Sequence, residues 1–127
     1  AMYINDTYWL LFPFKLKDSG VTLTYAGVGQ TLDSVNAHKL NLVFDNVGET
    51  PENRYVAYVN PDSYEIDQWE FYQNASDSLP RLVNPFKNYT GFNGVYLSLD
   101  RGNYKFSDVE VHTEIPDSLY QKLFETL

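Results

Sequence analysis

Two adjacent strand patterns in "RYVAYVNPDSYEIDQWEFYQ" (residues 54–73) constrain the fold more than any other feature of this chain. The first strand is predicted at Arg54–Asn60 and the second at Tyr64–Gln73, with the turn-forming "PDS" between them. Large apolar side chains alternate onto both faces of the first strand, so neither face is plainly polar. Such a strand must be covered on both sides, by a second layer of protein or by a ligand.

Similar short patterns recur along the chain and are separated by turn residues. Strands are predicted at Val21–Ala26, which Gly27 and Gly29 should break, at His38–Phe44, at Val95–Asp100, and at Tyr104–His112 with a bulge near Ser107 or Asp108. Residues 81–94 should be irregular or edge-like because they contain Pro85. Seven or so strands with short connections predict a mainly β protein, in which a curved antiparallel meander is half-closed.

Both ends of the chain are expected to carry short helical segments. Near the start, "NDTYWLLFPFKL" (residues 5–16) is too short for a membrane span and lacks the basic region of a signal peptide. We expect residues 8–12 to form a helical turn or short strand ended by Pro13, with Trp9 and Phe12 packed on the sheet as a cover. At the other end, three-four spacing of apolar residues predicts a short amphipathic helix at Pro116–Leu127.

Composition narrows the class of protein. A chain of 127 residues, 43% hydrophobic and 17% aromatic, has the size and apolar content of one folded domain, which we assign to residues 1–127. The net charge of −8 disfavours nucleic acid and anionic membrane surfaces as partners. No cysteine is present, so neither disulfides nor thiolate metal sites are expected. We interpret residues 1–2 as a cloning remnant.

No motif in the sequence indicates a cofactor, a metal or a nucleophilic enzyme. His38 and His112 have no second histidine at a ligand spacing, so we predict no metal site from them. The glycines at 27 and 29 lack the third glycine of a dinucleotide fingerprint and are interpreted as a turn. We therefore expect a protein that is not an enzyme and holds no cofactor.

Acidic residues leave two weaker alternatives open. Asp67 and Glu70 form a weak pair for hydrolysis, because they should point to opposite faces of a regular strand. Asp45, Glu49 and Glu52 share a loop and have the oxygen ligands that calcium prefers. A solvated acidic loop is the favoured interpretation.

Several of these segments resemble a known family. Thr50-Pro51, Arg54-Tyr55, Tyr58-Val59-Asn60, Ile66 and Trp69–Phe71 resemble a hairpin of uncharacterised Gram-negative envelope proteins, which are similar to outer-membrane lipoprotein carriers and lipoprotein-sorting proteins. "NDTYWLLFPFKL" recurs there before the first strand of the C-terminal half, and Val109–Val111 with Ile115–Tyr120 resembles its closing strand and following segment. The resemblance covers nearly the whole chain but only the C-terminal half of a usual family member.

The resemblance implies an incomplete antiparallel β-barrel whose concave face holds an apolar cavity closed by a lid. It further implies a periplasmic or envelope location and an acyl chain or lipoprotein as ligand. Under this hypothesis the cavity is lined by Tyr25, Leu42, Phe44, Tyr58, Trp69, Phe71 and Tyr96. The chain departs from the carriers in three respects. It has Asp62-Ser63-Tyr64 where the family hairpin commonly turns through a glycine, and it lacks the N-terminal strands and lid helices of the carriers. In addition, no arginine stands in an apolar sequence context where it would hold the lid.

Three further expectations complete the sequence-based picture. Trp69, Tyr72 and Tyr89 can instead be interpreted as exposed rings that stack on sugars in a carbohydrate-binding or adhesive module. The aromatic residues can also simply form the core. If the chain is half of a longer protein, its exposed sheet edge is expected to be able to pair with a second copy as a homodimer.

Overall fold

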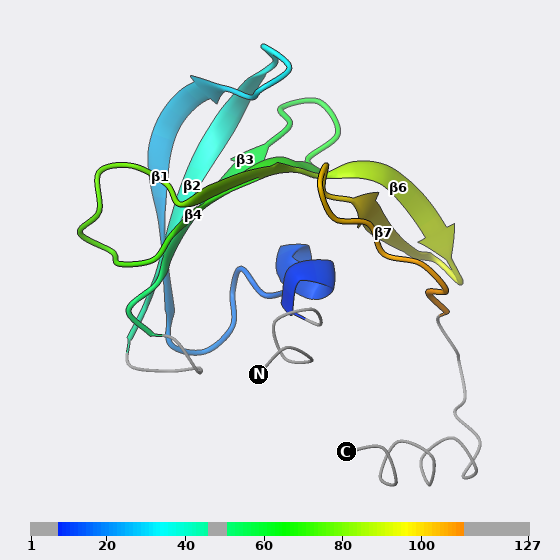
Figure 1. The fold of residues 1–127 in the computed structure, drawn as a ribbon, viewed down its shortest axis with the longest axis horizontal. Coiled ribbons are helices and arrows are strands. Elements are labelled where there is room, and N and C mark those ends of the chain that lie inside the picture. The colour runs from blue at the N-terminus through cyan, green and yellow to red at the C-terminus, as the bar shows by residue number, and fades with distance from the viewer. Residues whose placement is uncertain (1–7, 46–50, 111–127) are drawn as a thin grey trace, which may run out of the picture.

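The computed structural model describes residues 8–45 and 51–110. Its strands are β1 (Val21–Gln30), β2 (Asn36–Phe44), β3 (Arg54–Val59), β4 (Ile66–Tyr72), β5 (Leu82–Pro85), β6 (Lys87–Phe92) and β7 (Val95–Asp100). The first five form one antiparallel sheet in the order β1-β2-β3-β4-β5, and β6 and β7 form a separate hairpin. The five-stranded sheet curves without closing (Figure 1). The predicted mainly β, antiparallel meander is confirmed.

The hairpin of β3 and β4 is confirmed at the centre of this sheet. Arg54 pairs with Tyr72 and Tyr58 with Gln68, but the register then shifts so that Val59 pairs with Ile66. This bulge returns Ile66 to the face that carries the core. The four middle residues of β3 are buried. The expectation that both faces of this strand are covered is therefore confirmed.

Strand β1 is longer than predicted. It continues through Gly27 to Gln30, and its pairing with β2 shifts between Tyr25 and Val28. Gly27 adopts a φ of 85°, which glycine tolerates and L side chains rarely do. The glycine therefore bends the strand as a bulge, and the prediction that it breaks the strand is wrong.

Two other segments correct the sequence prediction. Residues 81–94 contain β5 and β6, which flank Phe86, so they are not irregular. The edge-like alternative is confirmed for β5, which ends the strand order of its sheet. Pro85 ends β5 because it has no N–H to donate, and the Phe86 N–H instead donates to the Asp67 carbonyl at 2.8 Å. Residues 104–110, the described part of the strand predicted at Tyr104–His112, form no strand. A single antiparallel bridge joins Lys105 to Asp100. His112 and the helix predicted at Pro116–Leu127 lie outside the described residues.

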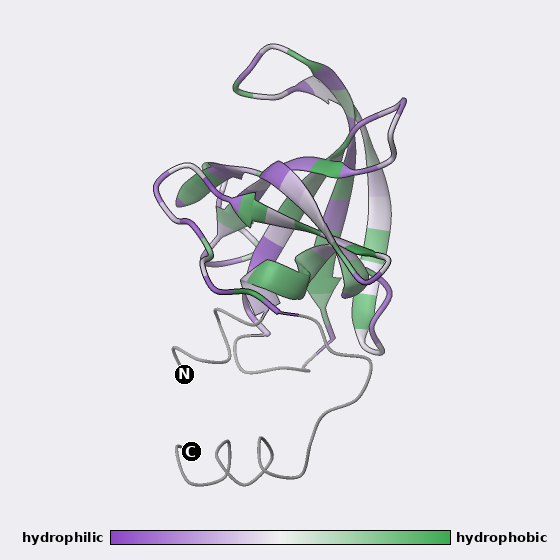
Figure 2. Ribbon diagram, turned by 90° about the vertical axis from the view of Figure 1, so that its right-hand side faces the viewer, coloured by the Kyte–Doolittle hydropathy of each residue, from purple (hydrophilic) through white to green (hydrophobic). Residues whose placement is uncertain are grey.

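The N-terminal segment, residues 8–16, lies on the concave side of the sheet (Figure 1). It begins with a helical turn at residues 8–11 and continues into the 3-10 turn η1 (Phe12–Phe14). Pro13 lies near the start of η1, where its missing N–H has no intrahelical partner to lose. Figure 2 shows that this helical stretch is hydrophobic. Three of its side chains, Tyr8, Trp9 and Phe12, pack in the core described next, while Phe14 is exposed.

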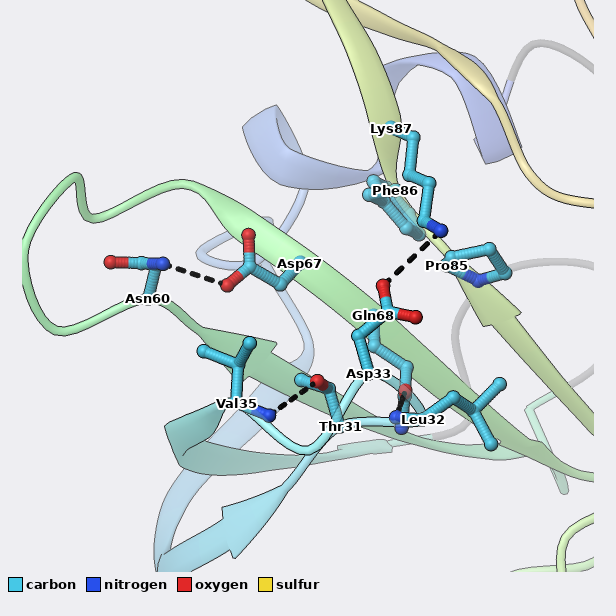
Figure 3. A pocket seen from close by; sticks show the side chains of 10 residues that line it. All are labelled: Thr31, Leu32, Asp33, Val35, Asn60, Asp67, Gln68, Pro85, Phe86 and Lys87. Carbon is cyan, nitrogen blue, oxygen red and sulfur yellow. Dashed lines mark hydrogen bonds and ion pairs between the residues drawn. The ribbon is translucent and has the colours of Figure 1, made fainter.

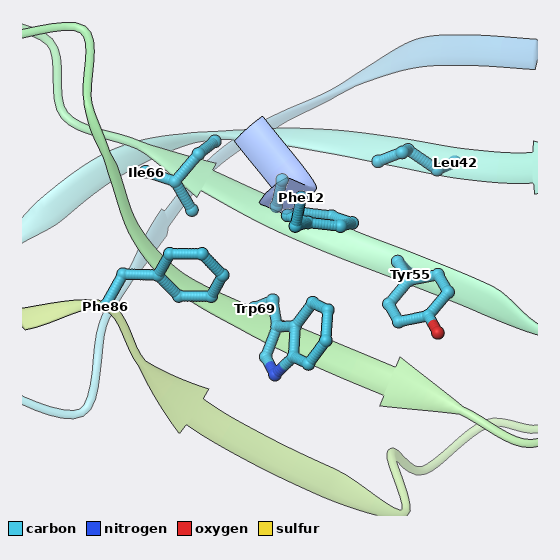
Figure 4. Close-up of a cluster of buried hydrophobic side chains, with 7 residues drawn as sticks. Phe12, Leu42, Tyr55, Ile66, Trp69 and Phe86 are labelled. Carbon is cyan, nitrogen blue, oxygen red and sulfur yellow. The ribbon is translucent and has the colours of Figure 1, made fainter. Parts of the chain in front are cut away.

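The main core lies between the N-terminal segment and the concave face. Its buried members are Phe12, Leu42, Tyr55, Ala57, Ile66, Trp69 and Phe86 (Figure 4). A second, smaller cluster contains Ala37, Val56, Tyr58 and Tyr72. There the Arg54 guanidinium stacks 3.7 Å from the Tyr72 ring centre and donates to the carbonyls of Ala75 and Asp77. This arginine thus ties the β4–β5 connection to the second cluster.

Candidate functional site

The N-terminal segment occupies the centre of the concave face. The ring of Phe12 is fully buried, and its centre lies 4.8 Å from that of Trp69 and 5.5 Å from that of Tyr55. Trp9 is half-buried and meets Trp69 edge to face at 5.6 Å. The predicted packing of Trp9 and Phe12 against strand residues is confirmed.

Four of the seven residues predicted to line a cavity belong to this packed centre. Leu42 and Trp69 are 0% and 1% exposed, and Phe44 and Phe71 are half-buried against the same cluster. Phe12 contacts Trp69 where the sequence predicted room for a ligand. These four side chains therefore belong to the protein core or pack against it, because the chain supplies its own apolar side chain there.

The other three predicted lining residues lie elsewhere. Tyr58 belongs to the second cluster, because alternation along β3 places it opposite Ala57 and Val59. Tyr25 is 62% exposed, and its hydroxyl lies 3.0 Å from Nδ1 of His38. Tyr96 is 65% exposed on β7 and lines the pocket described below. The prediction that all seven side chains share one cavity is therefore wrong.

A buried arginine that the sequence analysis missed holds the N-terminal segment. Arg101 is 1% exposed, with its guanidinium 3.5 Å from the centre of the Phe86 ring. It donates to the Trp9 carbonyl at 3.0 Å and to the carbonyl and hydroxyl of Ser98 at 2.9 and 2.6 Å. Burial lowers the pKa of Arg101 to about 10, although nearby Tyr89 and Asp100 oppose the shift. The sequence around Arg101 is polar, so its apolar surroundings arise from the fold and not from its neighbours in the chain.

Arg101 is part of a buried polar chain across four elements. The Trp69 indole N–H donates to the Asn84 side-chain oxygen at 3.1 Å, and the Asn84 amide donates to the Arg101 carbonyl at 3.1 Å. Ser98 in turn donates to the Lys87 carbonyl at 2.6 Å. These bonds satisfy polar groups that would be costly to bury alone. They also connect β4, β5 and the β6–β7 hairpin to the residues that hold Trp9.

An apolar pocket remains open beside the N-terminal segment, and we call it the concave pocket. Its volume is about 300 Å³, and it is lined by Pro13, Leu16, Leu40, Val59, Tyr64, Glu65, Ile66, Tyr89 and Tyr96. The hydroxyl of Tyr89 donates to the Ile66 carbonyl at 2.5 Å. Burial raises the pKa of Tyr89 well above its usual value, and the neighbouring Glu65 adds to this shift. Tyr89 is thus a neutral, fixed part of the pocket wall at physiological pH.

Two other pockets have more polar walls. One, of about 310 Å³, adjoins Trp9 and is lined by Glu52, Asn53, Tyr55, Phe71, Gln73 and Arg81. The other, of about 260 Å³, lies between the β1–β2 turn and the β5–β6 junction (Figure 3). Its polar groups bind one another: Leu32 N–H donates to Gln68, Asn60 donates to Asp67, and Lys87 pairs with Asp33. A ligand there would have to compete with these bonds, so the concave pocket is the better candidate.

The acidic residues considered for catalysis are engaged by other side chains. Asp67 accepts a hydrogen bond from the Asn60 amide at 2.9 Å. Glu70 accepts one from the Tyr58 hydroxyl at 3.0 Å, while Asp45 accepts one from Thr22 at 3.2 Å. Within residues 8–45 and 51–110, no three His, Cys, Asp or Glu side chains gather as a metal site. Glu49, from the proposed calcium loop, lies outside the described residues.

The rings assigned to sugar stacking are not available on the surface. Trp69 and Tyr72 are 1% and 7% exposed, and Tyr89 is a half-buried wall of the concave pocket. A flat sugar-binding surface made from these rings is therefore contradicted. The reason is again alternation, which directs Trp69 into one cluster and Tyr72 into the other.

Comparison of the chain with protein-family models, with curated proteins and with solved structures finds no match. In the part of the chain that the structure describes, no helix is both long and apolar enough to cross a membrane. The chain is thus classed by its own geometry, as an unclosed antiparallel meander with an N-terminal segment packed in its concave face and an apolar pocket beside that segment.

Proposed function

We propose that this protein is a non-catalytic envelope protein that binds an acyl chain, a lipoprotein or another apolar ligand on its concave face. The observation that carries the proposal is the concave pocket, whose walls are apolar and aromatic apart from Glu65. Pockets of this character are typical of small-molecule binding sites. The resemblance to outer-membrane lipoprotein carriers supports a periplasmic or envelope location.

The volume of the pocket limits the size of the ligand that it can bind. About 300 Å³ is at the lower end of the range for ligand pockets, so it accommodates a short chain or the end of a longer one. Each Å² of apolar ligand surface removed from water contributes about 25 cal/mol before the cost of ordering the ligand. Affinity therefore depends on how much of the chain the pocket covers.

A pocket-filling substitution tests this function. Leu40 lines the pocket, and Leu40→Phe adds apolar volume into the space that a ligand would occupy. We expect the uncharged fluorescent probe N-phenyl-1-naphthylamine to bind the wild type and to bind Leu40→Phe about tenfold more weakly or worse, since losing about 1.4 kcal/mol suffices for that. Circular dichroism and thermal unfolding establish that both proteins are folded.

The matched control is Leu79→Phe, because Leu79 is 78% exposed and lines none of the three pockets described above. Its affinity for the probe should equal that of the wild type. Solvent extraction and mass spectrometry of the purified protein provide a second readout. No bound lipid together with no saturable probe binding would overturn the proposed function.

We also propose that a second copy of the chain pairs along the outer edge of β1. This strand ends the order of its sheet, and its ten residues include no charge and no proline. Charged residues and prolines are common means of protecting an edge from pairing. The bulge at Gly27 is the one irregularity in the β1–β2 register.

A further inference from the structure

The rim of the concave pocket carries an exposed tyrosine in a strained conformation. Tyr64 is 80% exposed and has a φ of 60°, in the left-handed region that bulky L residues rarely adopt. This backbone conformation costs free energy, and an exposed ring regains little of it by packing. Tyr64 nevertheless lines the pocket, together with Tyr96 from β7.

The turn that presents Tyr64 is held by one asparagine. The Asn60 side-chain oxygen accepts from the N–H groups of Asp62 and Ser63 at 2.8 and 3.1 Å, and its carbonyl accepts from the Tyr64 N–H at 3.0 Å. The Asn60 N–H donates to the Glu65 carbonyl at 2.8 Å. These four bonds fix the turn, so the protein maintains the strained tyrosine through a dedicated local network.

Glu65, the next residue, is the single charged side chain of the pocket lining. Among residues 8–45 and 51–110, no lysine or arginine forms an ion pair with it. The whole chain carries a net charge of −8, which also favours a cationic partner. Tyrosine ring faces also attract cations, so the exposed Tyr64 and Tyr96 and the Glu65 carboxylate all favour a positively charged group at the rim of the pocket.

From this arrangement we propose that the ligand of the concave pocket is a cationic amphiphile. Its apolar chain lies against Leu40, Val59 and Leu16, and its ammonium group lies at the rim against the rings of Tyr64 and Tyr96 and the carboxylate of Glu65. The inference rests on the proposed function, because it assumes that the pocket takes an apolar chain. It adds the chemical class of the head group.

Three dodecyl amphiphiles test the head group separately from the chain. Calorimetric titrations with dodecyltrimethylammonium, dodecyl sulfate and dodecyl maltoside, each below its micelle concentration, compare a cation, an anion and a neutral head. We expect the cation to bind about tenfold more tightly than the maltoside, with the sulfate weakest. Equal affinities, or a preference for sulfate, would overturn the cationic inference while leaving the pocket function intact. No binding of any of the three would overturn both.

Substitutions in the turn provide the second arm of the test. Glu65→Gln should remove most of the preference for the cation over the maltoside, whereas Asp62→Asn removes a charge from the same turn, outside the pocket lining, and should retain it. Tyr64→Gly should raise the Tm, because glycine relieves the positive φ, and should weaken binding of the cation. A purely structural role for Tyr64 predicts a change in Tm with unchanged affinity, and that outcome would contradict its assignment as a ligand contact.

Discussion

Phe12 links segments that are distant along the chain. Its ring, which is 0% exposed, lies close to Tyr55 of β3, Trp69 of β4 and Phe86 beyond β5. Aromatic pairs at these separations contribute beyond the apolar area that they bury. This single side chain therefore joins the N-terminal segment to the curved sheet.

Truncation of this side chain should destabilise the protein strongly. We expect Phe12→Ala to lower the free energy of unfolding by about 3–5 kcal/mol, since it deletes a fully buried ring and leaves a cavity. Urea denaturation monitored by tryptophan fluorescence measures the change. The matched control is Phe14→Ala in the same turn, which removes a 59% exposed ring and should change stability by less than about 0.5 kcal/mol. Equal losses for the two variants would contradict the packed role of Phe12.

Among single residues, the sequence predicted burial within a short apolar segment better than contacts between residues far apart in the chain. Trp9 and Phe12 could be predicted as a cover because burying large apolar rings is favourable and most of those in a short apolar segment find a place in the core. Arg101 could not, because its partner Trp9 is 92 residues away and the sequence around it is polar. Tyr64 was missed for a related reason, since nothing in "NPDSYE" reveals a positive φ at its tyrosine.

Among the elements, the strands with strict alternation were predicted well. Strand β7 lies where the sequence placed it, and so does the hairpin β3–β4, except that β4 begins at Ile66 and leaves Tyr64 in the turn. The errors occur where a local backbone feature overrides composition. A bulge carries β1 through Gly27, and the segment expected to be irregular or edge-like contains two strands, the edge strand β5 and the hairpin strand β6, on either side of Phe86. Such local features depend on how each strand pairs with its neighbours, and the sequence of one segment does not reveal that pairing.

The outer edge of β1 is expected to mediate dimer formation. We expect the protein to form dimers at high concentration in sedimentation velocity, because the uncharged edge can extend the sheet into a second copy. Val28→Lys should return the protein to monomer, since it places a like charge on each copy at an edge position that is 60% exposed in the single chain. Leu79→Lys adds the same charge in an exposed loop and should leave the dimer unchanged. A wild type that stays monomeric throughout the concentration range would contradict the pairing.

The whole molecule combines a core that contains several buried tyrosines with a net charge of −8. The sequence predicted the aromatic content and the curved meander but left open whether the rings line a cavity or form the core. The structure assigns most of them to the core and leaves the concave pocket at its side. Which rings form core and which line the pocket depends on where residues 8–16 pack, and they pack on strands that are distant in the sequence.

Buried phenols make the stability of the whole fold sensitive to alkaline pH. Burial raises the pKa of Tyr55 to about 12, and it raises the pKa of Tyr8 and of Tyr89 as well. A tyrosine in the unfolded chain ionises near pH 10, so above that pH the unfolded state loses protons that the folded state retains. The contribution of Tyr55 is therefore complete below about pH 10 and is lost as the pH rises towards about 12, at about 1.4 kcal/mol per pH unit.

Urea denaturation at a series of pH values between about 9 and about 12 measures this loss, and tyrosinate absorbance should rise together with unfolding. Tyr55→Phe removes the ionisable hydroxyl while keeping the ring, so its stability should fall less steeply with pH than that of the wild type. Tyr64→Phe removes a hydroxyl from a ring that is 80% exposed and should leave the slope unchanged. Repulsion among the acidic groups acts on all three proteins alike, so the difference between their slopes isolates the buried hydroxyl. Parallel curves for the wild type and Tyr55→Phe would show that Tyr55 does not control the alkaline limit.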